Sequence, residues 1–214
     1  MNRFTYKNFY RRNLPHIQPE GATLFVTFRL ANSLPKEVVE RLKAEQEEAE
    51  NRIQQIADEN ERENQLDQTR RRFFGKWDEA LDSMIYGEKY LSNPNVADIV
   101  TESLLYRDGK VYDLESFSIM PTHGHVVFAP LKEAEDRYHS LSKIMHSFKL
   151  HTALEANKIL GRTGAFWQHE SYDHYVRDEG ELERIIKYVV YNPVKAGLVD
   201  DWKKWKWTYC KYNL

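Results

Sequence analysis

The sequence predicts an α+β fold in which helices cover an antiparallel sheet. Three observations support it: an alternating apolar strand near the N-terminus, two further strand-like segments separated by a proline, and helical stretches between and after them. The chain has 214 residues, enough for one domain with a buried core. We therefore expect a single domain over residues 1–214, with a helical elaboration after the first strand.

The first predicted strand covers residues 22–31. Leu24, Val26 and Phe28 alternate with Phe25 and Arg29 on the opposite side, which is the pattern of a half-buried strand. Residues 111–120 and 123–129 form two more predicted strands, separated by a proline turn. We expect these strands to pair with the first one in a sheet that is covered on one side.

A helical arm is predicted over residues 36–72. This range contains no glycine or proline, and eleven acidic and eight basic side chains give it helical composition. Apolar residues such as Leu42, Ile53 and Leu66 are sparse, so only a narrow seam can be buried. The seam could pair with another chain, or the arm could be one long solvated helix resting on its own domain, with a break near residues 58–64.

Further helices are predicted from composition and from their stop signals. They cover residues 73–90, 96–106, 138–160 and 179–191. Gly161 ends the third of these, and we expect the last to end before Pro193, because proline disfavours helical geometry in the residue before it. Residues 198–214 form a C-terminal tail rich in lysine and tryptophan.

Composition excludes several classes of protein. The single cysteine, Cys210, permits neither an intramolecular disulfide nor a zinc site built from cysteines. No stretch approaches the ~18 consecutive apolar residues of a membrane span, and residues 1–12 lack the apolar core of an export signal. We therefore expect a soluble, cytoplasmic protein with no membrane partner.

Although the net charge is only -2, three stretches are basic: residues 1–29, 141–163 and 203–211. Aromatic residues are interleaved with the bases in the first and third. This combination suits a protein that grips phosphates and stacks on unpaired bases, although ordinary solvated surfaces also contain it. Charge alone therefore leaves DNA, RNA and no nucleic acid open.

A pair of histidines is the first candidate for a chemical site. His123 and His125 lie two residues apart on a predicted strand, so both imidazoles face the same side and could chelate one divalent ion. A site with few protein ligands would leave positions for phosphate oxygens. A His-x-His pair on a strand is also common at surfaces and in cores, so the pair needs corroboration.

The last predicted helix supplies that corroboration. Its buried stripe comprises Leu182, Ile185, Ile186 and Val189. Tyr188 and Asn192 lie four residues apart on one flank of this stripe, whereas Tyr191 points away from it. The Tyr188 hydroxyl could reach a phosphate held by the histidines, and the Asn192 carbonyl oxygen could add a third metal ligand. A boundary tyrosine with a packed ring and a wet hydroxyl is the alternative.

Five segments resemble one known family. They are residues 9–16 (FYRRNLPH), 25–30 (FVTFRL), 119–125 (IMPTHGH), 166–174 (FWQHESYDH) and 188–197 (YVVYNPVKAG). In this order and spacing they resemble the REP-associated tyrosine transposases, which are single-tyrosine HUH transposases of the insertion-sequence-200-like group. The resemblance covers most of the chain except the arm.

The resemblance implies a ferredoxin-like (RRM-like) sandwich with His123 and His125 as the metal-binding pair. Tyr188 would be the nucleophile and Asn192 the third ligand. Mg²⁺ or Mn²⁺ would be the cofactor, and the partner would be single-stranded DNA with palindromic, REP-like hairpins, bound by a monomer or a homodimer. The residues expected to bind DNA are Arg11, Arg12, His16, Arg29, Lys143, Lys149 and Lys195.

Tyrosine suits a breaking-and-joining reaction. A phenol with a pKa near ~10 attacks poorly at neutral pH unless a metal or a base assists it. Its attack on a phosphodiester forms a 5′-phosphotyrosine and frees a 3′-hydroxyl, and the covalent link preserves the bond for rejoining. Tyr172 and Tyr175 are rival nucleophiles. His169 and His174 could supply a metal ligand or a proton shuttle, but we expect them to make local hydrogen bonds that shape the site.

The chain departs from the family at two positions. Gly124 stands between the histidines, where the family usually has a bulky apolar residue, and Thr122 replaces a common asparagine. Loss of that anchor would loosen the metal pair. Two alternatives therefore accompany the enzyme: a cleavage-deficient protein that binds hairpin DNA, and an RNA-binding ferredoxin-like module that stacks bases on sheet aromatics such as Phe25.

Overall fold

The computed structural model describes residues 9–11, 15–17, 19–83, 86–135 and 137–214, and for residues 9–11 and 15–17 it describes the backbone only. The chain divides into two compact units. One contains residues 1–31 and 89–214 and carries the sheet. The other contains residues 32–88 and is helical. We describe each unit by itself.

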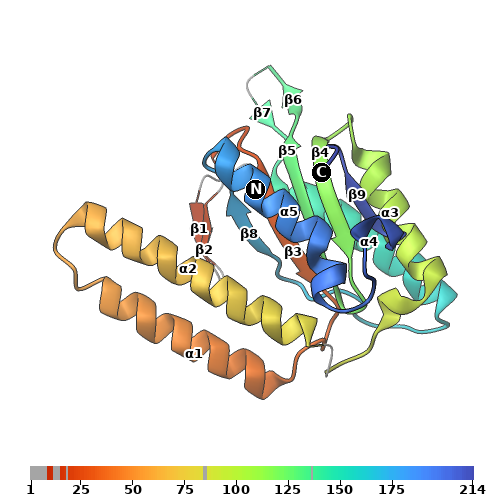
Figure 1. Cartoon of the computed structure of the whole chain (residues 1–214), viewed down its shortest axis with the longest axis horizontal. Coiled ribbons are helices and arrows are strands. Elements are labelled where there is room, and N and C mark those ends of the chain that lie inside the picture. The colour runs from red at the N-terminus through yellow and green to blue at the C-terminus, as the bar shows by residue number, and fades with distance from the viewer. Residues whose placement is uncertain (1–8, 12–14, 18, 84–85, 136) are drawn as a thin grey trace. The chain divides into compact units, whose positions relative to one another are not determined.

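The first unit is built on a five-stranded antiparallel sheet (Figure 1). In spatial order its strands are β8 (Tyr172–Tyr175), β3 (Leu24–Arg29), β5 (His123–Pro130), β4 (Tyr112–Ile119) and β9 (Thr208–Cys210). The three strands expected from the sequence are β3, β4 and β5, and β5 lies between the other two. Together with the helices below, they give the expected α+β, ferredoxin-like fold.

Helices α3 (Pro94–Arg107) and α4 (Leu141–Ile159) pack on one face of the sheet and form the main core with it. The side chains of Val26 and Phe28 point into this core, together with Val100 and Phe148 from the two helices. The Phe28 and Phe148 rings meet edge to face, with centroids 5.0 Å apart, and are one of its aromatic contacts. Apolar burial on this face supplies the main stabilising free energy of the unit.

Helix α5 (Glu179–Lys195) covers the other face of the sheet, so the expectation of a sheet covered on one side was wrong. Figure 1 shows α5 crossing in front of the strands. Phe25 of β3 contacts Tyr188 of α5, with ring centroids 6.1 Å apart. Strand β3 is therefore buried on both sides, and Phe25 is only 3% exposed, which alternation along one strand could not reveal.

Helix α5 also continues past Pro193, contrary to the expectation that it ends before this residue. Proline removes only its own N–H, and in the last turn of a helix this costs a single hydrogen bond. The helix is still closed by the Ala196 N–H, which donates to the Asn192 carbonyl oxygen at 2.9 Å. Asn192 therefore stays helical and fully buried.

The second unit consists of α1 (Lys36–Ile53) and α2 (Glu59–Asp82), which pack against each other. The arm is therefore not one long helix. The break lies at residues 54–58, just before the Asp58 side chain caps α2 through the Glu61 N–H at 2.8 Å. No break separates residues 72 and 73, so the inserted helical region extends beyond residue 72 and ends at Asp82 rather than continuing to residue 90.

Shorter elements complete the description. They are the hairpin of β1 (Phe9–Arg11) and β2 (Pro15–Ile17), the hairpin of β6 (Lys132–Ala134) and β7 (Arg137–Tyr138), and two turns of 3₁₀ helix, η1 (Tyr90–Ser92) and η2 (Trp202–Lys204). No described helix combines the length and the apolar character needed to cross a membrane.

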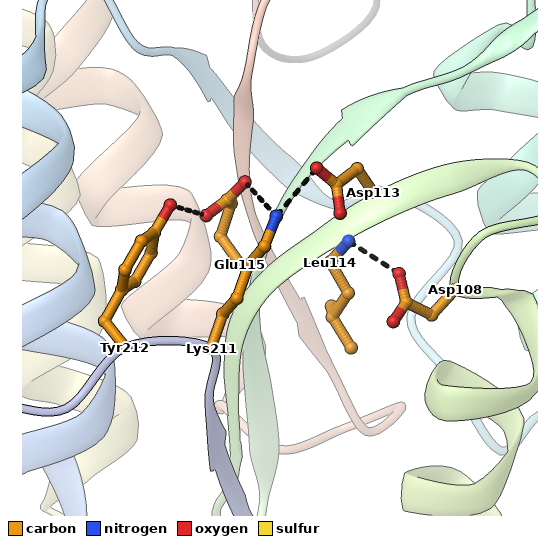
Figure 2. Close-up of polar contacts among 6 residues, drawn as sticks. All are labelled: Asp108, Asp113, Leu114, Glu115, Lys211 and Tyr212. Carbon is orange, nitrogen blue, oxygen red and sulfur yellow. Dashed lines mark hydrogen bonds and ion pairs between the residues drawn. The ribbon is translucent and has the colours of Figure 1, made fainter.

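The C-terminal segment is part of the sheet, because β9 pairs with β4 at its edge. Figure 2 shows how polar side chains fix it: Lys211 Nζ contacts Asp113 at 2.8 Å and Glu115 at 3.4 Å, and the Tyr212 hydroxyl donates to Glu115. The hydrogen bond to Glu115, with burial as a smaller cause, raises the pKa of Tyr212 to about 12. Trp205 donates its indole N–H to the Ile119 carbonyl oxygen.

Gly124 lies where β5 packs closely against the core. A Cβ atom at this position would lie 2.5 Å from Cζ of Phe28 and 3.1 Å from Cδ1 of Ile119. The Phe28 ring is held in place by Phe148 and by Trp167. The space that a bulky residue between the histidines would occupy is therefore filled by Phe28 from the neighbouring strand, so the strand is anchored there from the side.

We expect Gly124→Leu to destabilise the protein by about 1–3 kcal/mol, because the new side chain overpacks the core against Phe28. Urea unfolding would measure this loss. In a Phe28→Ala background the same substitution should cost much less, since the leucine then enters the vacated space. An equal cost in both backgrounds would show that Phe28 does not fill this position.

Candidate functional site

The histidine pair lies at the start of β5, on the sheet face that α5 covers. The Nε2 atoms of His123 and His125 are 3.1 Å apart, and both side chains are fully buried. Both rings offer nitrogens that could hold a metal ion. Period-2 alternation along β5 brings the two rings to one side, as the sequence indicated.

Each ring is held at its other nitrogen by a threonine. Thr27 Oγ1 lies 2.9 Å from Nδ1 of His125, and Thr122 Oγ1 lies 3.0 Å from Nδ1 of His123. Thr27 sits directly opposite His125 in the pairing of β3 with β5. Both hydroxyls are buried, so these hydrogen bonds orient the rings without competition from solvent.

Helix α5 brings two more of the expected residues to the pair. The Nδ2 atom of Asn192 lies 3.4 Å from Nε2 of His125 and donates to the Tyr188 hydroxyl, also at 3.4 Å. The rings of Tyr188 and His125 are 5.6 Å apart between centroids. Tyr188, Asn192 and His125 therefore form one continuous group, while Tyr191 of the same helix is 46% exposed and points away.

Phe25 forms an aromatic wall beside this group. Its ring lies 5.8 Å from that of His125, 6.1 Å from that of Tyr188 and 6.4 Å from that of Tyr172. Of the two rival nucleophiles, Tyr172 is thus on the site side of the sheet, whereas Tyr175 pairs with Leu24 and faces the main core. Tyr172 is separated from the histidines by the width of β3.

The donor atoms fit a divalent ion. Two imidazole nitrogens about 3 Å apart match the separation of two ligands on one ion with metal–nitrogen bonds of ~2.0–2.1 Å. Among the described residues, Oδ1 of Asn192 has no hydrogen-bond partner although it is buried. A half-turn of the amide would present this oxygen to the histidines, and a metal ion would satisfy it.

Burial of the site disfavours the charged form of His125. Burial, with the positive charge of Lys195 as a smaller cause, lowers the pKa of His125 to about 3. His125 is therefore neutral at physiological pH, the form that ligates metals. The Lys195 ammonium also lies 5.6 Å from the centre of the Tyr188 ring, where it can attract a phosphate.

Two further basic residues lie at the same end of the sheet. Arg29 pairs with His123 across β3 and β5, and Lys149 donates to the carbonyl oxygens of Gln168 and His169 at 2.8 and 3.2 Å. Burial, opposed by Glu170, lowers the pKa of Arg29 to about 10. Burial and the charge of Arg29 lower the pKa of Lys149 to about 7.

Of the other residues expected to bind DNA, Lys143 is described and lies away from this group. Lys143 lies in the first turn of α4, on the opposite face of the sheet, and pairs with Glu133 beyond the far end of β5. Arg11 belongs to β1 and His16 to β2, but their side chains are not described. Arg12 lies outside the described residues.

The histidines of the fourth motif have local partners. Nε2 of His174 lies 3.2 Å from the Glu181 carboxylate, which also accepts the Arg177 N–H at 2.9 Å. This group links β8 to the first turn of α5. The carbonyl oxygen of His169 accepts a hydrogen bond from Lys149. His174 therefore holds together the two elements that carry Tyr172 and Tyr188, as expected for a residue that shapes the site.

Sequence reasoning missed the contribution of Thr27. The signal was present, because Thr27 is a polar residue on the second side of the first predicted strand, between Phe25 and Arg29. It could be assigned only with the strand register, which places it opposite His125 rather than one residue away. Thr122 drew notice only as a departure from the family.

Comparison with known proteins agrees with the motifs. No family model matches the chain. A protein of Haemophilus influenzae named REP-associated tyrosine transposase is 27% identical over 103 residues, which cover 45% of this chain and 58% of that protein. The match thus spans less than two thirds of the relative. A solved structure of a REP-associated tyrosine transposase bound to a REP hairpin aligns with 93% of this chain and 80% of its own, at 14% identity and a TM-score of 0.47.

The similarity to the Haemophilus influenzae protein confirms the resemblance to REP-associated tyrosine transposases that the five motifs indicate.

We expect the free energy of unfolding to fall as the pH drops below about 6.5. The unfolded chain protonates His125 near its ordinary pKa of 6.5, whereas the folded protein resists protonation until about pH 3. Between these values the unfolded state binds one more proton at this site, so stability decreases by up to about 1.4 kcal/mol per pH unit on acidification.

Urea unfolding between pH 4 and pH 7 measures this slope. His125→Gln should reduce it, while His151→Gln, on the exposed side of α4, should leave it unchanged. A slope that is the same in the wild type and in His125→Gln would contradict the assignment.

Proposed function

We propose that this protein is a metal-dependent single-stranded DNA endonuclease and strand transferase that acts beside palindromic, REP-like hairpins. The observation that carries the proposal is the continuous group in which the Tyr188 hydroxyl, the Asn192 amide and the His125 imidazole are linked at 3.4 Å. A nucleophile and a ligand pair of this kind are what tyrosine-mediated cleavage requires. The name of the Haemophilus relative supports the choice of REP-like DNA.

The metal would be held by His123, His125 and Asn192. Mg²⁺ or Mn²⁺ bound there would polarise the phosphate and stabilise the negative charge that develops in the transition state. Burial of the pair keeps His125 neutral and excludes water from around the ligands. Excluding water also protects a covalent intermediate from hydrolysis.

Tyr188 would carry the covalent step. Its hydroxyl oxygen would attack the phosphorus atom and give up its proton, while the bond from phosphorus to the 3′ oxygen breaks and that oxygen takes up a proton to leave as a 3′-hydroxyl, so that no net proton is consumed. The product is a 5′-phosphotyrosine. Attack by a second 3′-hydroxyl reverses the exchange and releases Tyr188, so the number of phosphate ester bonds is conserved and no energy cofactor is required.

Basic residues around the group would position the strand. Lys195 lies beside the Tyr188 ring, and Arg29 and Lys149 lie at the same end of the sheet. Their charges would neutralise backbone phosphates on either side of the cleaved bond. Arg11, Arg12 and His16 would contact the foot of the hairpin, and Lys143 would act at a separate contact.

The RNA-binding alternative requires sheet aromatics that are open to bases. Phe25, which would be such a platform, is buried beneath α5. A cleavage-deficient DNA-binding protein would follow from a loosened metal pair, but Phe28 fills the space left by Gly124. Both observations favour the enzyme.

We expect Tyr188→Phe to abolish the covalent protein–DNA adduct while leaving DNA affinity within about twofold, because the substitution removes only the nucleophilic oxygen. The measurement uses a radiolabelled hairpin oligonucleotide with Mn²⁺, followed by denaturing electrophoresis for the adduct. Binding is measured separately, by mobility shift in EDTA.

Two controls sharpen this test. Tyr191→Phe changes the exposed tyrosine of the same helix and should retain the adduct, and Tyr172→Phe changes the rival nucleophile and should retain it too. An adduct that persists in Tyr188→Phe and disappears in Tyr172→Phe would move the nucleophile to β8. Binding without any adduct in the wild type would favour the cleavage-deficient protein.

A further inference from the structure

We propose that Thr27 and Thr122 are positioning residues of the histidine pair, whose hydroxyls allow each ring to hold its proton on either nitrogen. The inference rests on the proposed metal site and adds to it the residues that prepare the ligands. Neither threonine would touch the metal or the DNA; each would act through the imidazole beside it.

The two hydroxyls occupy equivalent places although they come from different elements. Thr27 reaches Nδ1 of His125 from the neighbouring strand, and Thr122 reaches Nδ1 of His123 from the turn that precedes β5. Thr27 is 6% exposed and Thr122 1% exposed. In both rings Nδ1 is therefore hydrogen-bonded to a threonine hydroxyl, and the two Nε2 atoms face each other.

Nε2 atoms 3.1 Å apart admit two arrangements. When a hydrogen bond joins them, one Nε2 carries a proton and the other offers a lone pair. When a cation joins them, both must offer lone pairs, so the proton of a neutral ring has to be on Nδ1. One of the two rings must therefore place its proton on Nε2 in the first arrangement and on Nδ1 in the second.

The partner at Nδ1 decides whether both arrangements are available. A backbone carbonyl only accepts and would fix the proton on Nδ1, and a backbone N–H only donates and would fix it on Nε2. A hydroxyl does either after a rotation about its C–O bond. Because the threonines are buried, a ring without such a partner would leave Nδ1 unsatisfied in one arrangement or in both.

The ability of a hydroxyl both to donate and to accept gives Thr122 a role at the position where the family commonly has an asparagine. It also explains why Thr27 and Thr122 can be buried, since an unpaired buried hydroxyl would be costly. Thr208 lies on the same sheet face and offers a comparison. Its hydroxyl contacts the Ser118 hydroxyl at 3.0 Å rather than a histidine ring.

We expect Thr27→Val to weaken Mn²⁺ binding by about 10- to 100-fold, the usual effect of removing a group that orients a metal ligand. Thr122→Val should have an effect of the same order. Free Mn²⁺ in the full-length protein is counted by electron paramagnetic resonance during a titration. Thr27→Ser and Thr122→Ser keep the hydroxyl and should bind Mn²⁺ within about threefold of the wild type.

Thr208→Val is the matched control, since it makes the same substitution on the same sheet face and should leave Mn²⁺ affinity unchanged. Urea unfolding of all variants separates metal affinity from stability. Equal Mn²⁺ affinity in wild type and both valine variants would overturn the inference while leaving the metal site intact. No Mn²⁺ binding by the wild type would instead refute the proposed function together with the inference.

A second measurement detects the protons themselves. Imidazole ¹⁵N resonances distinguish a proton on Nδ1 from one on Nε2, and diamagnetic Mg²⁺ leaves them visible. We expect saturation of the wild type with Mg²⁺ to place the proton of both rings on Nδ1. Retention of an Nε2 proton on either ring at saturation would overturn the inference.

Discussion

The burial of the His123 and His125 imidazoles between β5 and α5 is the constraint on which the rest of this structure depends. Burial keeps His125 neutral, and a neutral ring needs a hydrogen-bond partner at each nitrogen. The partners come from a neighbouring strand for one ring and from a turn for the other. The position of the histidine pair is thus fixed by elements of the sheet and the turn that leads into it.

Helix α5 creates this environment. By covering the second face of the sheet, it buries Phe25 and brings Tyr188 and Asn192 to the histidines in a single step. The helix runs through Pro193 without losing the geometry of Asn192. A helix that stopped before the proline would leave the amide outside the group, so the extra turn contributes directly to the site.

The opposite face explains how β5 tolerates a glycine between the histidines. Phe28 occupies the volume that a side chain at position 124 would need, and the core aromatics hold its ring. The side chain that fills this volume thus comes from β3 rather than from β5, and the core stays densely packed. The sequence alone suggests that the missing side chain at position 124 loosens the histidine pair. In the folded structure Phe28 takes its place.

The sequence by itself determined β3, β4 and β5, the helices α3, α4 and α5, and the side of β5 on which His123 and His125 lie, because alternation and helical periodicity are local properties. Tertiary structure decided which strands are neighbours, and therefore that Thr27 meets His125 and that Phe28 meets Gly124. It also decided that α5 covers a second face and that the arm folds back as α1 and α2. Register and layer order depend on contacts between residues far apart in the chain, which no local pattern encodes.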